Sequence, residues 1–442
     1  MLKRMIYSLL LLLLAPVILW TISRLLGPSP SERRALALME QAWQPEGRNA
    51  YADFWLADYP LDAAGRDAVM AEDVRRFAAL KPDAEGHYPG LVSSAEGRWP
   101  KDQPDAEQPP GFCSHDDDCL AKVRADLSAY QTLVAQHSGW LDRRVAAAKG
   151  DYLQSPFQPR ADMPFPPFRW AFAPATRWAL QFANGDKLGA LGGVCDAIND
   201  WRRLGANTDL LVVRMVASAY VGRGYGRLAG QMLAEVPADT ALPASCQHAF
   251  ALPQPEDVSM CRAMRGEFAF VSHVMRHQIP PTAKQYSRFH TYVFLDAEMT
   301  RAQSAKSMVG VCEPANQQAI LQDLPIAPVV YPGHLRIQCV SNAIGCILGD
   351  IAAPAFSDYA DRLRDQAAIQ RTLAALLWLR HQPALLAAPA TIPDALPEQF
   401  TSAAHPLRFD TERGELSIPM LGKYTQGKPI SVPLPGSQLA AD

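Results

Sequence analysis

Apolar residues recur every three or four positions over most of this chain, which is the spacing of helices that bury one face. The segment 31–43 places Leu36, Met39 and Trp43 on one side, behind Ser31, a residue suited to cap a helix. The same period returns in further segments, at 61–80, 116–134, 187–205, 256–277, 284–308 and 356–381. The sequence therefore predicts a mainly α fold.

One stretch near the C-terminus alternates instead of following the helical period. Leu407 and Phe409, and then Leu416 and Ile418, flank a Thr-Glu-Arg-Gly turn, which is typical of a small β-hairpin. We expect the hairpin to cap the helical domain. The chain then divides into an N-terminal helix, a helical domain and a C-terminal segment with the hairpin, over residues 1–27, 28–390 and 391–442.

Glycine followed by aspartate marks helix boundaries in the middle of the chain. Gly185 ends one helix and Asp186 caps the next, while Asp209 is placed to cap a third. The phrase A-x-x-F-A-x-G-D resembles tetratricopeptide hairpins over about 45 residues, although no sustained repeat of about 34 residues extends it. The resemblance implies an irregular domain of helical hairpins.

An almost unbroken apolar run covers residues 5–22. As a helix it is roughly 27 Å long, close to the hydrocarbon thickness of a bilayer. Lys3 and Arg4 precede it, so the positive-inside rule keeps the N-terminus in the cytoplasm. A cleaved signal peptide is the alternative, but the run is long for a signal core and no small-x-small site follows it. We therefore expect a single-pass inner-membrane protein, anchored through residues 5–22, with its C-terminal domain in the periplasm.

Composition and charge narrow the class of protein. Hydrophobic residues make up 48% and charged residues 20% of the chain, as in a globular protein and not a disordered one. The net charge of −3 and the pI near 6.4 provide no electrostatic footprint for nucleic acid. We predict no nucleic-acid partner.

Eight cysteines follow the apolar run, and an oxidising compartment favours disulfides among them. Proximity in the sequence suggests three bridges, namely Cys113 with Cys119, Cys246 with Cys261, and Cys339 with Cys346. Cys195 and Cys312 are then left to pair at long range or to stay as small buried hydrophobes. No C-x-x-C occurs, so the sequence favours neither a zinc ribbon nor a thioredoxin-type site.

The phrase HVMRH contains the sharpest candidate for metal chemistry. His273 and His277 share a helix face at the spacing that zinc needs, but Val274 stands where a zincin has its glutamate. Possible further ligands are Glu267, His290, Asp296 and Glu298. Two histidines at this spacing also occur on ordinary polar helix faces. We favour that interpretation and predict neither a metal nor a cofactor.

Signatures of hydrolases are missing, because the chain has no G-x-S-x-G, S-x-x-K, H-E-x-x-H or Walker loop. We therefore name no catalytic residue. Arg265 has the chemistry to bind a substrate carboxylate, but ion pairs of Arg262 and Arg265 with Glu267 within one helix are the simpler expectation.

Several phrases together resemble a group of uncharacterised, membrane-anchored periplasmic α-helical proteins of Gram-negative bacteria, some of which are similar to immunity proteins. These phrases are FCSHDDDCL, LPASCQHAF, CRAMRGEF and LRFDTERGELSI. The resemblance implies a protein partner, such as a periplasm-acting effector, and carries over no site residues. The expected function is a membrane-anchored periplasmic binding protein, in its specific form an inhibitor of a secreted toxin. The alternatives are an envelope hydrolase or metal-dependent enzyme, and a scaffold for envelope assembly.

Overall fold

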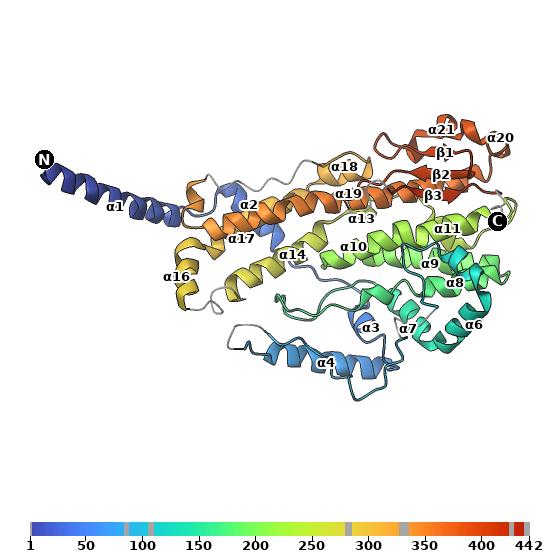
Figure 1. Ribbon diagram of the computed structural model, residues 1–442, viewed down its shortest axis with the longest axis horizontal. Helices are drawn as coiled ribbons and strands as arrows, with labels where there is room; N and C mark the ends of the chain where they lie inside the picture. Colours follow the sequence, from blue (N-terminus) through green and yellow to red (C-terminus); the bar gives the residue numbers. More distant parts are fainter. Residues whose placement is uncertain are drawn as a thin grey trace.

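The molecule is mainly helical, which confirms the predicted fold class, and its helices run mostly along one long axis (Figure 1). This computed structural model describes residues 2–83, 88–104, 110–278, 285–326, 336–423 and 428–436. The side chains of residues 2–12, 278, 285–288 and 353–355 are not described.

The α-helices of the first half are α1 (Leu2–Leu25), α2 (Pro30–Met39), α3 (Tyr51–Trp55), α4 (Ala63–Ala79), α5 (Cys119–Ala125), α6 (Leu127–Gln136), α7 (Ser138–Ala148), α8 (Pro174–Ala183), α9 (Lys187–Ala206) and α10 (Leu211–Ala219). Those of the second half are α11 (Tyr225–Ala234), α12 (Ala244–Ala249), α13 (Pro255–Val258), α14 (Cys261–His273), α16 (Gln285–Phe294), α17 (Ala297–Met308), α18 (Pro314–Leu321), α19 (Ala343–Leu379), α20 (Pro383–Ala387) and α21 (Ile392–Ala395). Two π-helical turns are η2 (Tyr220–Gly224) and η3 (Val274–Gln278). The 3-10 turns are η1 (Phe168–Trp170), η4 (Val309–Cys312), η5 (Ile337–Cys339), η6 (Pro389–Thr391) and η7 (Glu398–Phe400).

Helix α19 joins the two main hydrophobic clusters of the molecule. Phe356 and Leu363 in its first part are buried with residues of α2, α14 and η4. Ile369 and Leu376 further along are buried with residues of α9, α10 and α11. The long helix therefore holds both parts of the body in one packed unit.

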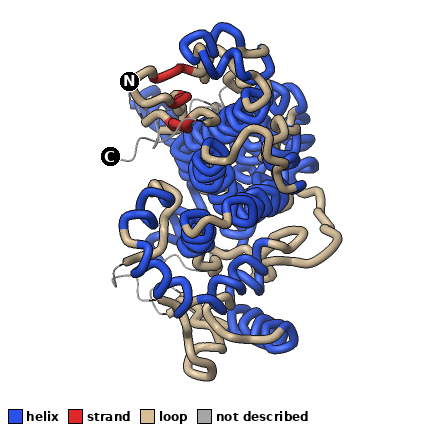
Figure 2. The backbone as a smooth tube through the Cα atoms, turned by 90° about the vertical axis from the view of Figure 1, so that its right-hand side faces the viewer, coloured by secondary structure: helices blue, strands red, loops and turns tan. Residues whose placement is uncertain are grey.

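A three-stranded antiparallel sheet lies on one side of the helices (Figure 2). Strands β1 (Arg408–Asp410) and β2 (Glu415–Ile418) pair with Phe409 opposite Leu416, which confirms the predicted hairpin. A third strand, β3 (Ile430–Pro433), was not predicted and pairs Val432 with Leu416. A Cβ atom on Gly230 in α11 would lie 2.8 Å from Val432, so this glycine allows the sheet to approach the helix closely.

A buried ionic cluster fastens the C-terminal segment to the helices. His405 lies between two carboxylates, with Nδ1 2.6 Å from Asp323 and Nε2 2.9 Å from Asp365 of α19. Burial opposes the charged form of His405, but the hydrogen bonds to both carboxylates outweigh it and raise the pKa of His405. Arg364 and Arg371 of α19 also form ion pairs with Asp323.

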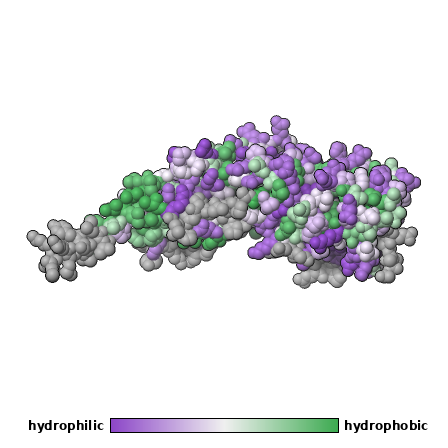
Figure 3. Space-filling model, turned by 90° about the horizontal axis from the view of Figure 1, so that it is seen from above, coloured by the Kyte–Doolittle hydropathy of each residue, from purple (hydrophilic) through white to green (hydrophobic). Residues whose placement is uncertain are grey.

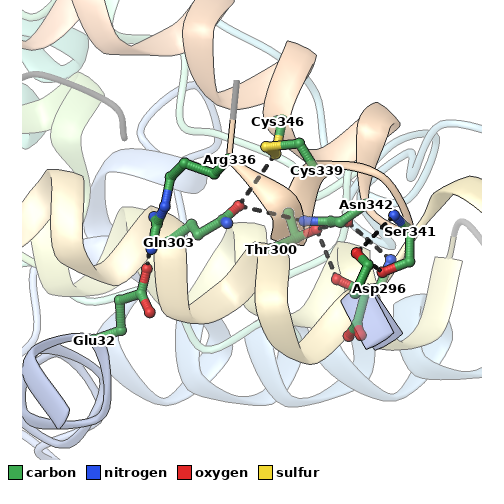
Figure 4. The surroundings of a disulfide bond; sticks show 10 residues. Glu32, Asp296, Thr300, Gln303, Arg336, Cys339, Ser341, Asn342 and Cys346 are labelled. Atoms are coloured by element: carbon green, nitrogen blue, oxygen red, sulfur yellow. Dashed lines mark hydrogen bonds and ion pairs between the residues drawn. A yellow bond between two sulfur atoms is a disulfide. The ribbon is translucent and has the colours of Figure 1, made fainter. Parts of the chain in front are cut away.

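The end of α1 is bonded to the body. The indole of Trp20 donates to the carbonyl of Val293 at 2.6 Å, and the Ser23 hydroxyl lies 2.8 Å from that of Ser341. The Cys339–Cys346 disulfide lies beside this contact, where Asn342 bonds to α17 (Figure 4). In the described part of the chain, no helix is long and apolar enough to cross a membrane. The side chains of residues 1–12, which include much of the predicted anchor, lie outside the described residues.

All eight cysteines form disulfides, but one of the three predicted pairings is wrong. Cys113–Cys119 and Cys339–Cys346 are bridged as predicted. Cys246 and Cys261 are not bonded to each other, because each lies on a helix that packs against a different neighbour. The observed bridges are Cys195–Cys246, which joins α9 to α12, and Cys261–Cys312, which joins α14 to η4. Packing between helices, and not proximity in the sequence, determines these pairs.

The disulfides differ in the chain length that they close. Cys195 and Cys246 are 51 residues apart and Cys113 and Cys119 only 6, so chain entropy predicts a contribution of about 4 and about 2 kcal/mol. We expect the Cys195→Ala/Cys246→Ala variant to lose more unfolding free energy in urea than the Cys113→Ala/Cys119→Ala variant. Equal losses would contradict this order.

Candidate functional site

A groove of about 450 Å³ lies between the end of α2, one face of α14 and the turn η3. Its polar lining is rich in arginine and histidine. The charged and imidazole side chains of the lining are Glu40, Asp209, Arg262, Arg265, His273, Arg276 and His277. Met39, Trp43, Phe268 and Pro159 contribute apolar surface. The groove is therefore the candidate site that the sequence-predicted histidines and Arg265 share.

One face of helix α14 forms a wall of the groove and closely approaches the segment before α10. Arg262, Ala269 and His273 follow one another at helical spacing and line the groove. Gly266 lies on the same face and also lines the groove, and a Cβ atom added to it would lie 1.7 Å from the carbonyl oxygen of Asp209. No other residue type fits position 266 without moving this contact.

Arg262 is held in place without a carboxylate partner among the described residues. It donates to the carbonyl of Ala206 at 2.7 Å and to the side-chain oxygen of Asn207 at 2.5 Å. Its guanidinium lies 4.5 Å from the centre of the Trp43 ring, a cation–π contact. These contacts orient the group but leave its charge uncompensated.

Arg265 is the second cation of the groove that has no ion pair in the described part of the chain. One of its terminal nitrogens donates to the side-chain oxygen of Gln41 at 3.0 Å. Its Nε is buried and makes no hydrogen bond within the described residues. Burial, and then the charge of Arg265, lower the pKa of Arg262, so the two guanidinium groups repel each other. An anion placed between them would relieve this repulsion.

The other cations around the groove are neutralised. Arg301 forms ion pairs with Glu40 and Glu298 and donates to Ser272 at 2.5 Å. Arg276 donates to Glu298 at 3.2 Å. The charged groups of the lining without an ion pair in the described part of the chain are therefore Arg262, Arg265 and the carboxyl group of Asp209.

Asp209 is the remaining carboxylate of the groove lining. Burial raises its pKa to about 6, against hydrogen bonds from Gln154 and the Ser155 backbone that lower it. Its Oδ1 has no partner in the described structure. The prediction that Asp209 caps a helix is wrong, because Leu210 occupies the N-cap position of α10 without a side-chain bond.

The two histidines lie side by side, with ring centres 4.7 Å apart. Burial, and then the charge of His277, lower the pKa of His273. Among the described residues no group of three or more His, Cys, Asp or Glu side chains is placed to hold a metal ion.

The further ligands considered from the sequence lie in other settings. Glu298 is paired with arginines, and Asp296 accepts from the backbone of Met299 as the cap of α17. His290 stacks on Phe294. Burial raises the pKa of Glu267, and the expected helix ion pairs of Glu267 do not form, because Arg262 and Arg265 donate elsewhere.

Comparisons with known proteins provide no information on the function of the groove. No family model, curated protein or solved structure matches this chain.

The sequence indicated Arg265 and both histidines as candidate site residues. It did not indicate that Trp43 and Asp209, which come from other segments, line the same groove. The spacing of Arg262 and Arg265 on one helix face was the available signal for a cationic surface.

Asp209 provides a test of the groove's electrostatics. Its pKa is near 4 in the unfolded chain and about 6 in the folded protein, so ionisation costs stability progressively as the pH rises from about 4 to about 6. We expect Asp209→Asn to melt at the wild-type temperature at pH 4 and about 2 °C or more above it at pH 7.5. The exposed Asp394→Asn is the matched control. A pH-independent difference for Asp209→Asn would contradict the buried, unpaired carboxylate.

Proposed function

We propose that this chain is a membrane-anchored periplasmic binding protein that captures an acidic segment of another protein in the arginine-lined groove. The observation that carries the proposal is the pair Arg262 and Arg265, adjacent in the groove and without a carboxylate partner among the described residues. A buried, unpartnered guanidinium nitrogen on Arg265 adds an unused donor.

The chemistry of the groove matches carboxylates better than other ligands. A guanidinium group presents parallel N–H donors that match both oxygens of a carboxylate, and such bonds are stronger than neutral ones. Trp43 provides an apolar wall beside Arg262. A volume of about 450 Å³ holds a few side chains, so we infer that the groove takes an Asp- or Glu-containing loop of the partner.

The proposed location rests on the N-terminal sequence and on the cysteines. The run 5–22 has the length and flanking charges of an inner-membrane anchor, and the four disulfides suit an oxidising compartment. We also propose that the helical body is built from tetratricopeptide-like hairpins.

The specific form that we propose is an inhibitor or immunity protein against a periplasm-acting toxin. The resemblance of the cysteine-containing phrases to anchored immunity-like proteins supports it. The same groove argues less well for the metal-dependent enzyme, because Arg276 flanks His277 and positive charge disfavours a bound cation. A scaffold role has no specific support in the groove.

The binding proposal predicts a charge-specific effect. We expect purified protein to bind a fluorescein-labelled hexaglutamate peptide, measured by anisotropy, and Arg262→Gln/Arg265→Gln to weaken that binding at least about tenfold, because two charge-assisted hydrogen bonds are lost. Affinity should also fall as salt is raised.

Arg75→Gln/Arg408→Gln is the matched control, since it removes the same charge from two exposed arginines outside the groove. An equal loss of peptide affinity in the control variant would remove the support for the groove as the binding site. Failure of the wild-type protein to bind the peptide would do the same.

A further inference from the structure

Large apolar side chains are exposed around the place where α1 joins the body. We define the apolar collar as Phe289 and Tyr292 of α16, Ile337 of η5, and Ile347, Leu348 and Ile351 of α19. Tyr292 is 69% exposed and Ile351 71%. Figure 3 shows apolar surface gathered at this end of the molecule. Soluble surfaces rarely gather this much apolar area without a binding role.

The collar residues share one side of each element that carries them. Phe289 and Tyr292 are three positions apart and Ile347 and Ile351 four, so each pair lies on one helix face. The backbone of α16 meets α1 through the bond from Trp20 to Val293. Cys346, directly before Ile347, is buried in the disulfide to Cys339, which fixes the start of α19 beside η5. The exposed apolar face is thus held rigidly next to α1.

The level of the collar along α1 matches the boundary of a bilayer. The bonds from α1 to α16 and to Ser341 start at Trp20 and Ser23, which leaves residues 2–19 beyond the body. Those residues form roughly 27 Å of helix, about the hydrocarbon thickness. Figure 1 shows that α16 runs across the long axis, whereas α1 projects from the body along it. If α1 spans the membrane, α16 crosses its axis at the end of the span and therefore lies parallel to the membrane surface.

We propose that the apolar collar inserts into the headgroup interface on the periplasmic side of the membrane that α1 spans. This inference rests on the anchoring part of the proposed function. Aromatic side chains such as Phe289 and Tyr292 favour the interface, and helices with one apolar face lie in it. The collar is continuous with the exposed apolar surface of α1, where Val17 is 58% and Ile18 54% exposed. A bilayer that surrounds α1 therefore brings its interface to the collar without a further partner.

The consequence is a body with a fixed orientation on the membrane. An anchor alone leaves a domain free to tilt, whereas the bonded α1 junction and the embedded collar together hold it at one angle. The arginine-lined groove then points in one direction relative to the membrane surface.

Photocrosslinking in the full chain tests the collar. Benzoylphenylalanine is placed at Tyr292 or Ile351 in cells, with Leu14 of α1 as the anchor control and the exposed Leu188 of α9 as the remote control. After irradiation, mass spectrometry of the purified protein detects phospholipid adducts. We expect adducts at positions 14, 292 and 351, with a yield at 292 at least about tenfold above that at 188.

The two controls separate the possible failures. Phospholipid adducts at position 14 but not at 292 or 351 would contradict insertion of the collar, while membrane anchoring by α1 would remain supported. The absence of adducts at all of these positions would overturn the anchor and the collar together. A protein crosslink at 292, to a second copy or to another protein, would show that the collar is a protein interface and would equally overturn the proposal.

Discussion

Burial of α19 is the constraint on which the rest of the structure depends. Its first part packs with α2 and α14, which form the arginine-lined groove, and its later part packs with α9, α10 and α11. Its start is bridged to η5 beside α1, and Asp365 holds the C-terminal segment through His405. The junction with α1, the groove and the sheet therefore share one element, so their relative positions are set together.

The two arginines of the groove differ from several buried arginines that form ion pairs. Arg144 is paired with Asp58, Arg371 with Asp323 and Arg301 with Glu40, as expected because an unpaired buried charge is costly. Arg262 and Arg265 lie close together without such partners in the described structure. Arg214 and Arg380 are also buried without an ion pair in the described part of the chain, but backbone carbonyls accept from their guanidinium groups. Nε of Arg265, by contrast, has no acceptor among the described residues and is the unused donor for the anion that we propose as a ligand.

Sequence patterns predicted local structure better than long-range contacts. The alternation around Leu416 yielded the hairpin, but Pro433 obscured the similar alternation of β3. The Cys195–Cys246 bridge depends on how α12 lies on α9, which no spacing reveals. The groove was predictable only as the charged face of α14. Asp209 lies at the groove because Gly266 allows a close contact with its backbone. No local sequence pattern predicts a tertiary contact of this kind.

The central claim is that the helical body is anchored to the membrane and lies in the periplasm. A measurement of membrane topology tests this claim most directly. Alkaline phosphatase, which is active only in the periplasm, would be fused after Asp442. Membranes from the same cells would be washed with carbonate. The account predicts an active fusion that stays in the membrane pellet. An inactive fusion, with a cytoplasm-only reporter active at the same junction, would contradict the location, the role of the disulfides and the proposed partner together.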